Sequence, residues 1–263
     1  MVDQQSLSAR RFGGMQRLYG VLPARQIQDS HVLVVGIGGV GSWVAEALAR
    51  SGVGELTMID MDHIAESNIN RQIHALETTL GMAKIEAMRE RIALINPACK
   101  VHCVDTFVAP ENWTSLIPEG IAAIVDACDQ VSAKTAMADW ARRNKALLVC
   151  VGAAGGKRHS HLVDVADLSL VTHDPLLAQL RYRLRKYHGA PKDGKRIGTL
   201  CVFSREAVAP PDASCNLQSD GSLNCHGYGS SVTVTATFGM CAAGLVIDKI
   251  SQGQSESKNS AII

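Results

Sequence analysis

Short apolar runs alternate with longer helical patterns along the first 155 residues of the chain. The short runs are rich in β-branched residues and are bounded by glycine or polar clusters, so they predict buried strands. They cover residues 31–36, 55–60, 100–105, 121–127 and 146–153. The intervening stretches carry apolar residues at helical spacing and predict helices. They cover residues 39–52, 78–95 and 132–144.

Strands that alternate with helices at this spacing predict an α/β fold with a Rossmann-like, doubly wound sheet. The nucleotide-binding half, about residues 28–155, should be parallel. Residues 157–230 are less periodic and richer in Gly, Pro and basic residues. We interpret them as an elaboration that makes the second half of the sheet mixed. Residues 1–250 are therefore expected to form one domain, and the polar tail 251–263 to be disordered.

Apolar content and charge narrow the class of protein. The longest apolar stretch, residues 232–247, is shorter than the about 20 residues of a membrane span, so a buried helix against the sheet is expected. The net charge of +1 excludes a global field that attracts nucleic acid or membranes. None of the eight cysteines forms a Cys-x-x-Cys pair, and the opening residues lack an apolar signal segment. These features favour reduced thiols in a cytoplasmic protein without a membrane partner.

A glycine cluster joins the first predicted strand to the first predicted helix. Gly36, Gly38 and Gly41 satisfy the pattern Gly-x-Gly-x-x-Gly, with Gly39 and Val40 between them. Glycines allow a tight strand-to-helix turn and close approach of the backbone to a phosphate, while the helix N-terminus offers free N–H groups. The pattern alone fits NAD, FAD and ATP equally.

Polar residues beyond the second strand favour ATP. Asp60 ends that strand, where an acidic residue accepts hydrogen bonds from a ribose. The segment that follows is crowded with polar side chains: Asp62, Asn68, Asn70, Arg71 and Gln72. Arg71 and Lys84 could both reach a triphosphate, whereas a dinucleotide needs fewer cations. Asp129 follows the strand 121–127 at the same edge, where a carboxylate suits magnesium.

Two of these positions have alternative interpretations, and a third acidic residue nearby needs one. Asp62 could instead cap a turn, because aspartate favours turns. Gln72 could stand behind the residues that touch the nucleotide. Asp126, the other acidic residue after strand 121–127, is more readily explained as a structural residue at the strand end than as a ligand.

The ordered set of motifs resembles the ThiF/MoeB/HesA branch of the ubiquitin-activating enzyme superfamily over about residues 8–155. The resemblance implies ATP-dependent adenylation of a carboxylate. By position, it implies that Asp60 binds the ribose, that Asn68, Arg71 and Lys84 bind phosphates, and that Asp129 holds magnesium.

The stretch RRFGGMQR, before the first strand, resembles the N-terminal arginine segment of these enzymes. In homodimeric members that arginine reaches into the partner's ATP site. Arg11 matches the first arginine of the segment, and Arg17 is the alternative.

A local basic segment stands out against the neutral whole. Residues 181–196 contain seven Lys or Arg and one Asp, with Tyr182 and Tyr187 interleaved. Cations could contact a phosphate backbone, and aromatic rings could stack on unpaired bases. The candidate tRNA-binding residues are Arg181, Arg183, Arg185 and Lys186. The alternative is a solvated helix with ordinary surface charge.

The same segment extends the resemblance. The motifs DPL, RLRK, VFSRE and VTVTATFG are similar to the tRNA-modifying members of the superfamily over about residues 8–250. The resemblance implies a tRNA whose adenosine beside the anticodon carries threonylcarbamoyl. It also implies adenylation of the threonyl carboxylate, cyclisation with net loss of water, a homodimer, and a functional link to a cysteine desulfurase and its sulfur acceptor.

An activator of a ubiquitin-like sulfur carrier is the alternative function, although its common pair of Cys-x-x-Cys motifs is missing. Cys225, in a polar glycine-containing loop, is the candidate thiol for sulfur transfer or attack on an adenylate. A non-catalytic loop thiol is the competing interpretation, because no basic cluster is near it in the sequence to lower its pKa.

Overall fold

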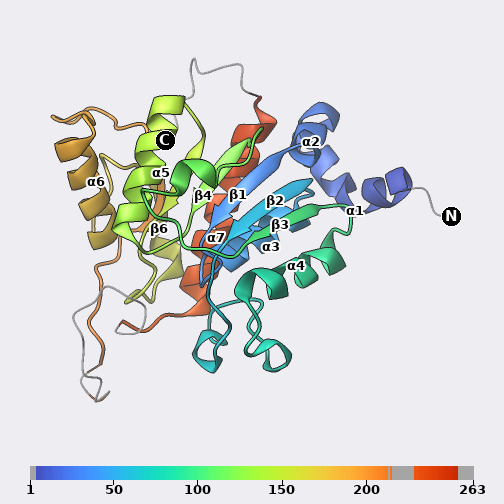
Figure 1. The fold of residues 1–263 in the computed structure, drawn as a ribbon, viewed down its shortest axis with the longest axis horizontal. Coiled ribbons are helices and arrows are strands. Elements are labelled where there is room, and N and C mark those ends of the chain that lie inside the picture. Colours follow the sequence, from blue (N-terminus) through green and yellow to red (C-terminus); the bar gives the residue numbers. More distant parts are fainter. Residues whose placement is uncertain (1–3, 213, 215–227, 254–263) are drawn as a thin grey trace.

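The computed structural model describes residues 4–212, 214 and 228–253, so Cys225 and most of the expected disordered tail lie outside the described residues. The described part contains a seven-stranded sheet covered by helices on both faces (Figure 1). The strands are β1 His31–Val35, β2 Glu55–Ile59, β3 Lys100–Val104, β4 Ala123–Asp126, β5 Leu148–Val151, β6 Val163–Asp167 and β7 Leu200–Ser204. The longer helices are α1 Gln4–Tyr19, α2 Val21–Gln28, α3 Gly41–Arg50, α4 Lys84–Ile95, α5 Val131–Asn144, α6 Pro175–Tyr187 and α7 Val232–Ser251.

The strand order β3-β2-β1-β4-β5-β7-β6 confirms the predicted doubly wound fold. All neighbouring strands run parallel except β6, which pairs antiparallel with β7 at the sheet edge. The second half is therefore mixed, as expected. The chain reverses its direction of winding between β1 and β4, and the crevice outside that switch point is the place where such sheets bind ligands.

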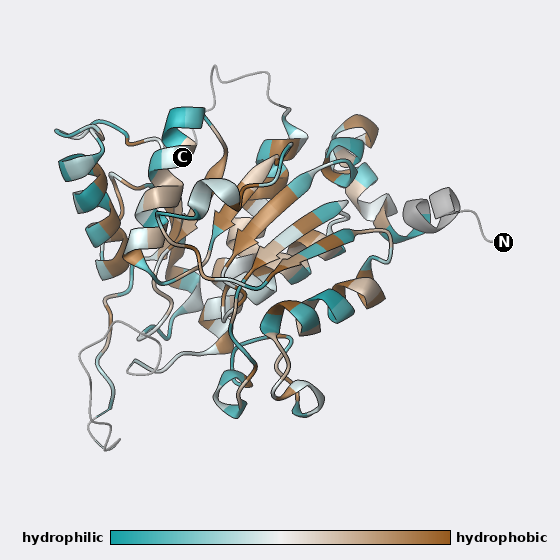
Figure 2. Cartoon of the chain, in the orientation of Figure 1, coloured by the Kyte–Doolittle hydropathy of each residue, from teal (hydrophilic) through white to brown (hydrophobic). Residues whose placement is uncertain are grey.

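Alternation along the strands separates two apolar cores. In β1, Val32 and Val34 join the core under α3, α4 and α7, whereas Leu33 and Val35 join the core under α5 and α6. Successive side chains of a strand point to opposite faces, so a central strand needs apolar residues at every position. The central strands are accordingly largely hydrophobic in Figure 2, and the outer faces of α4 and α6 are hydrophilic.

Helix α7 explains the long apolar stretch near the end of the chain. It is long and apolar enough to cross a membrane by length and composition. In the fold, however, Val234, Phe238 and Val246 are fully buried in the core formed with α3 and the sheet. Gly239 permits this approach, because a Cβ there would lie 2.6 Å from the Trp43 Cβ. The predicted buried helix is thus present, and it continues to Ser251.

The sequence pattern missed several boundaries. The helix expected over 78–95 begins at Lys84, because Glu77–Thr79 is a separate 3-10 turn and Gly81 has a φ of +81°. Helices α1 and α2 were not anticipated, since two adjacent glycines in α1 oppose helix formation locally. Phe12 compensates through long-range packing: it is buried against Gly52.

Candidate nucleotide and substrate site

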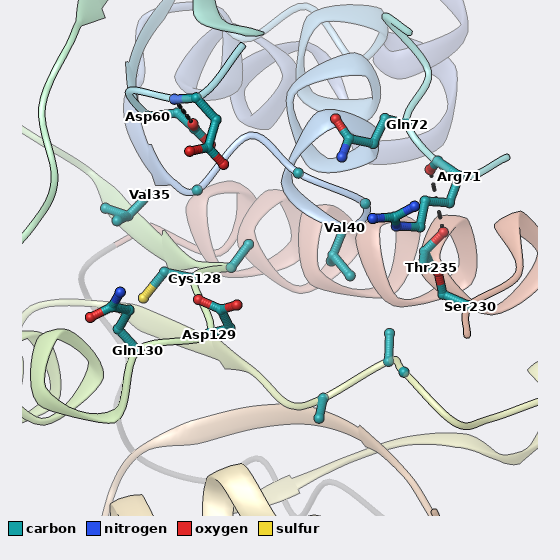
Figure 3. A pocket seen from close by; sticks show the side chains of 18 of the residues that line it. Val35, Val40, Asp60, Arg71, Gln72, Cys128, Asp129, Gln130, Ser230 and Thr235 are labelled. Carbon is teal, nitrogen blue, oxygen red and sulfur yellow. Dashed lines mark hydrogen bonds between the residues drawn. The ribbon is translucent and has the colours of Figure 1, made fainter. Parts of the chain in front are cut away.

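A cavity of ≈ 580 Å³ opens at the carboxyl edge of the sheet, where the β1–β4 switch point lies. Its size is within the range of small-molecule sites. One end is lined by the glycine turn and the segment after β2, and the other by the residues that follow β5. Figure 3 shows side chains from both sides pointing into this space. All the nucleotide-binding residues predicted from the sequence line this cavity, except Gly41.

The glycine turn is shaped by steric contacts that exclude side chains. Gly36 has a φ of +84°, and a Cβ on Gly41 would lie 1.7 Å from the Gly36 carbonyl oxygen. Only glycine at both positions lets the strand turn directly into α3. In the described part of the chain, the N–H groups of Gly38, Gly39 and Val40 have no hydrogen-bond partner. Free N–H groups at a helix N-terminus form a site suited to phosphate.

Asp60 is fixed by the loops on both sides of it. Its Oδ2 accepts a hydrogen bond from the Ile37 N–H at 2.6 Å, and its Oδ1 accepts one from the Asp62 N–H at 2.8 Å. Burial raises the pKa of the Asp60 carboxyl, and the Lys84 ammonium opposes that shift. Each carboxylate oxygen can accept a further bond, which leaves capacity for a ribose hydroxyl.

Lys84 begins α4 and turns back towards the cavity. Its Nζ lies 2.7 Å from the Asp62 Oδ2, and its backbone N–H donates to the Asp62 carbonyl at 2.9 Å. The Lys84 side chain is 8% exposed, whereas that of Asp62 is 54% exposed. Asp62 therefore holds the ammonium in place rather than capping a turn with its side chain.

Arg71 lies beside the glycine turn, on the side away from Asp60 (Figure 3). Its Nη1 donates to the Ser67 carbonyl at 2.6 Å and to the Asn70 Oδ1 at 2.9 Å. Its own carbonyl accepts bonds from Trp43 Nε1 and Thr235 Oγ1. Arg71 is thus tied to α3 and α7 through its backbone. A guanidinium has further donors on Nε and Nη2, which leaves capacity for a phosphate.

Two amides accompany Arg71. Asn68 is buried and its Oδ1 accepts from the Ala65 N–H at 3.2 Å, so it shapes the loop as well as lining the cavity. Gln72 is 5% exposed, and its Oε1 has no partner among the described residues. A buried acceptor without a partner costs free energy, so Gln72 has unused capacity towards a ligand.

The two acidic residues after β4 have different surroundings. Asp126 is fully buried, and its Oδ1 lies 3.0 Å from the Nζ of Lys134, which is also fully buried. The Lys134 ammonium also donates to the Val151 carbonyl at 2.7 Å, which ties β4 to β5. Asp126 is therefore structural, as the sequence favoured. Asp129 is exposed and points into the cavity beside Val40 (Figure 3), with no partner in the described part of the chain.

Several cavity residues were not predicted from the sequence. The segment Gly152–Gly155 follows β5, and Pro175 and Leu176 begin α6. The rule that ligands bind at the carboxyl ends of parallel strands was a signal for the first group. Asp174 followed by proline was a signal for the second, because it is a typical helix start. Tyr228 and Thr235, from a remote part of the chain, had no such local signal.

The predicted arginines lie away from this cavity. Arg11 and Arg17 belong to α1, and neither lines the cavity of its own chain. The Arg11 Nη1 donates to the Ile95 carbonyl at 2.7 Å. Figure 1 shows α1 at the far side of β3, where the sheet ends.

Three basic residues of α6, Arg181, Arg185 and Lys186, line a second, more open groove. Arg181 uses its Nη1 for the carbonyls of Leu168 and Val171. Arg185 uses its Nε for the Pro191 carbonyl. Arg183 and Lys186 are exposed, and the Lys186 ammonium lies 5.0 Å from the centre of the Tyr187 ring. Arg181 and Arg185 thus also stabilise the surrounding loops through main-chain carbonyls, whereas Arg183 and Lys186 extend into solvent.

Comparison with known proteins agrees with this geometry. Residues 14–261 match the ThiF family. The tRNA threonylcarbamoyladenosine dehydratase of Haemophilus influenzae is 43% identical over 92% of this chain and 93% of that protein. The E. coli dehydratase TcdA in complex with ATP has a TM-score of 0.87 and 41% identity, covering 98% of this chain and 100% of that one. Its AMP complex has a TM-score of 0.85 and 42% identity, covering 97% and 99%. The chain belongs to the ThiF family.

Proposed function

We propose that this protein is an ATP-dependent tRNA threonylcarbamoyladenosine dehydratase. One observation carries the proposal: a single cavity joins a phosphate-binding glycine turn to the first residues of a basic helix. At the nucleotide end, the cations Lys84 and Arg71 can bind the phosphates of ATP. At the other end lie the first residues of α6, whose cations can bind the phosphates of the tRNA that carries the substrate carboxylate. The relatives that match over nearly the whole chain include complexes with ATP and with AMP, the expected by-product of adenylation.

The reaction activates a poor electrophile. The threonyl carboxylate attacks the α-phosphorus of ATP and pyrophosphate leaves, which forms an acyl-adenylate. A neighbouring group of the same modification then attacks the activated carbonyl and expels AMP, so the net change is loss of one water. Ring closure is intramolecular, and the enzyme contributes mainly orientation and exclusion of water. No protein nucleophile is required, which leaves Cys225 outside the chemistry proposed here.

The nucleotide residues take roles that follow from their contacts. Gly36 to Gly41 and the N-terminus of α3 hold phosphate, and Asp60 accepts a ribose hydroxyl. Lys84, Arg71 and Asn68 hold the phosphate oxygens on which charge accumulates in the transition state. Gln72 lines the same end of the cavity, and its unpartnered Oε1 accepts a hydrogen bond from an N–H or O–H group of the nucleotide. Asp62 holds Lys84 in position until a phosphate competes for the ammonium.

Asp129 is the residue that would hold magnesium. Its carboxylate is exposed to the cavity and has no partner among the described residues. Magnesium is usually bound by one or two carboxylates together with phosphate oxygens, so a single free carboxylate fits. The ion would neutralise charge on the phosphates that leave.

Helix α6 supplies the contact with tRNA. Its first residues line the cavity, and its cations lie further along the same helix. At about 1.5 Å per residue, Arg181 to Lys186 stand roughly 9–17 Å from Pro175 along the axis. This spacing supports the proposal that the helix contacts phosphates of an anticodon loop while the modified base reaches the cavity. Tyr182 and Tyr187 are 57% and 64% exposed and can stack on unpaired bases.

The working form is a homodimer in the cytoplasm. Helices α1 and α2 expose Leu18, Val21 and Leu22, which are 74%, 68% and 75% exposed. An apolar cluster of this kind favours burial against a second copy. Arg11 or Arg17 then completes the partner's nucleotide site, because neither reaches the cavity of its own chain. A cysteine desulfurase and its sulfur acceptor are the proposed functional partners.

The deciding experiment is ATP–pyrophosphate exchange with and without tRNA that carries threonylcarbamoyladenosine. The modified tRNA should stimulate exchange, and mass spectrometry of the nucleoside should show loss of one water. Unmodified tRNA is the matched control and should give neither result. Exchange that instead required a small protein ending in Gly-Gly would assign the chain to sulfur-carrier activation.

A further inference from the structure

Lys157 is a buried cation surrounded by main-chain oxygens. Its side chain is almost fully enclosed, and the residue is 2% exposed. The Nζ donates to the carbonyls of His173 at 3.2 Å, Ser204 at 3.4 Å and Glu206 at 2.7 Å. An ammonium has three N–H donors, so the three carbonyls satisfy it completely. Burial lowers the pKa of Lys157, and the nearby carboxylates of Asp174 and Glu206 oppose that lowering.

The three carbonyls belong to two segments that meet Lys157 only in the folded chain. His173 precedes α6, whereas Ser204 ends β7 and Glu206 lies two residues further on. The carboxylate of Glu206 returns to the backbone N–H groups of Arg158 and His159, the two residues after Lys157. The segment around Lys157 and the segment around Glu206 are therefore joined twice. The Lys157 ammonium binds the main chain of the Glu206 segment, and the Glu206 carboxylate binds the main chain of the Lys157 segment.

The segment that Lys157 holds is the wall of the substrate end of the cavity. Gly156, next to it, donates to the Gly229 carbonyl at 3.0 Å and accepts from the Ala209 N–H at 2.8 Å. The neighbouring residues Gly155, Val208 and Tyr228 line the cavity. At the other end of the wall, the Asp174 Oδ2 accepts from the Ala153 N–H at 2.9 Å. The wall is thus clamped by Asp174 at one end and by Lys157 at the other.

We propose that Lys157 is a positioning residue for the substrate: its ammonium holds the wall Gly152–Gly155 against the start of α6, so that a carboxylate delivered along α6 meets the nucleotide in one orientation. The proposal rests on the proposed function for the identity of that substrate. Lys157 does not line the cavity itself and acts through the backbone it holds. The nucleotide end is built on β1, β2 and α4, which make none of the three contacts.

The test compares Lys157→Met, which keeps length and removes the donors, with Lys157→Gln, whose amide keeps two donors. Arg158→Ala is the matched control, because Arg158 is the exposed next residue and carries the same charge. The Met variant should raise KM for the modified tRNA or lower kcat about 10- to 100-fold, the cost of a misplaced reactant. Its Kd for ATP should stay within about twofold, since distant sites are independent. The Gln variant should fall between, and the control should match the wild type.

Backbone hydrogen exchange provides a readout that does not depend on activity. In Lys157→Met, exchange should accelerate in residues 152–158 and 204–209 and remain unchanged in the glycine turn 36–41. If the wild type fails to convert modified tRNA while this exchange pattern holds, the proposed function fails and the clamp stands. A parallel rise in the ATP Kd, unchanged kinetics, or loss of cooperative unfolding in the Met variant would each overturn the proposal.

Discussion

The Lys84 ammonium lies 2.7 Å from the Asp62 carboxylate, with the lysine nearly buried and the aspartate half exposed. This pair means that the chain itself holds the cation that we propose for phosphate binding at the cavity, before any nucleotide arrives. Asp62 aims the charge, and Lys84 is the member of the pair expected to contact phosphate. Substitution of the two residues should therefore have unequal effects.

Lys84→Met should lower ATP–pyrophosphate exchange by about 100- to 1000-fold, because it removes a preorganised charge from the developing phosphates. Asp62→Asn keeps the ammonium but removes the carboxylate that aims it, so it should have a smaller effect. Exchange rates at saturating ATP measure both. Equal losses in the two variants would show that the pair acts as a unit and would contradict this division of roles.

Gly41→Ala should destabilise the protein by about 3 kcal/mol and abolish ATP binding, because the new Cβ overlaps the Gly36 carbonyl oxygen and forces the turn open. Gly38→Ala is the matched control. A Cβ at Gly38 meets nothing within 4 Å, so its free energy of unfolding should stay within about 1 kcal/mol of the wild type. Urea denaturation compares the stability of the two variants, and calorimetric titration with ATP measures the binding lost in Gly41→Ala.

The buried His74 should make stability fall in acid. His74 is 2% exposed and both ring nitrogens lack partners among the described residues. Burial lowers its pKa from 6.5 to about 4, with smaller effects from Lys84 and Arg91. Between pH 6.5 and about 4, His74 is therefore protonated in the unfolded chain but neutral in the folded chain. The contribution of about 3 kcal/mol is present above pH 6.5 and is lost as the pH falls through 4.

Urea denaturation at several pH values measures this effect. His74→Leu should flatten the dependence of the unfolding free energy on pH between 6.5 and 4. His161→Gln, which removes an exposed histidine, should leave that slope as it is in the wild type. A slope that survives in the His74 variant would assign the acid sensitivity to other groups.

The pair Lys134–Asp126 should be costly to break and cheaper to replace. Lys134→Met leaves a fully buried carboxylate without its counter-ion and should destabilise the protein by about 3–5 kcal/mol. The double variant Lys134→Met with Asp126→Leu removes both charges and should recover part of that loss. Chemical denaturation of the single and double variants gives the coupling. Additive losses would exclude a specific ion pair.

The exposed cations of α6 should control the salt dependence of tRNA binding. Arg183→Ala with Lys186→Ala should weaken binding and reduce the slope of log K against log salt by about 1.5–2 units, since two fewer phosphate contacts release counterions. Arg89→Ala with Arg143→Ala removes the same charge from exposed sites on α4 and α5 and is the control. An unchanged slope in the α6 variant would remove this helix from the interface.

The sequence by itself determined the nucleotide half of the protein. The apolar runs, the glycine turn and the polar residues after each strand are local features, and in a parallel sheet every strand ends at the same edge. Gly36, Asp60 and Asp129 could therefore be placed together from their positions along the chain. Lys84 could be included because it is a cation in the stretch after the second strand, but its place at the first position of α4 came only from the structure.

Only the tertiary structure decided the substrate half. There the chain passes from β5 to the edge strand β6 and returns as β7 between them, an order that local periodicity does not encode. That path brings Lys157 to three carbonyls more than 15 residues away, and it brings Tyr228 to the cavity wall. Burial and pairing of these groups depend on contacts between distant segments, so residue type and spacing alone could not reveal them.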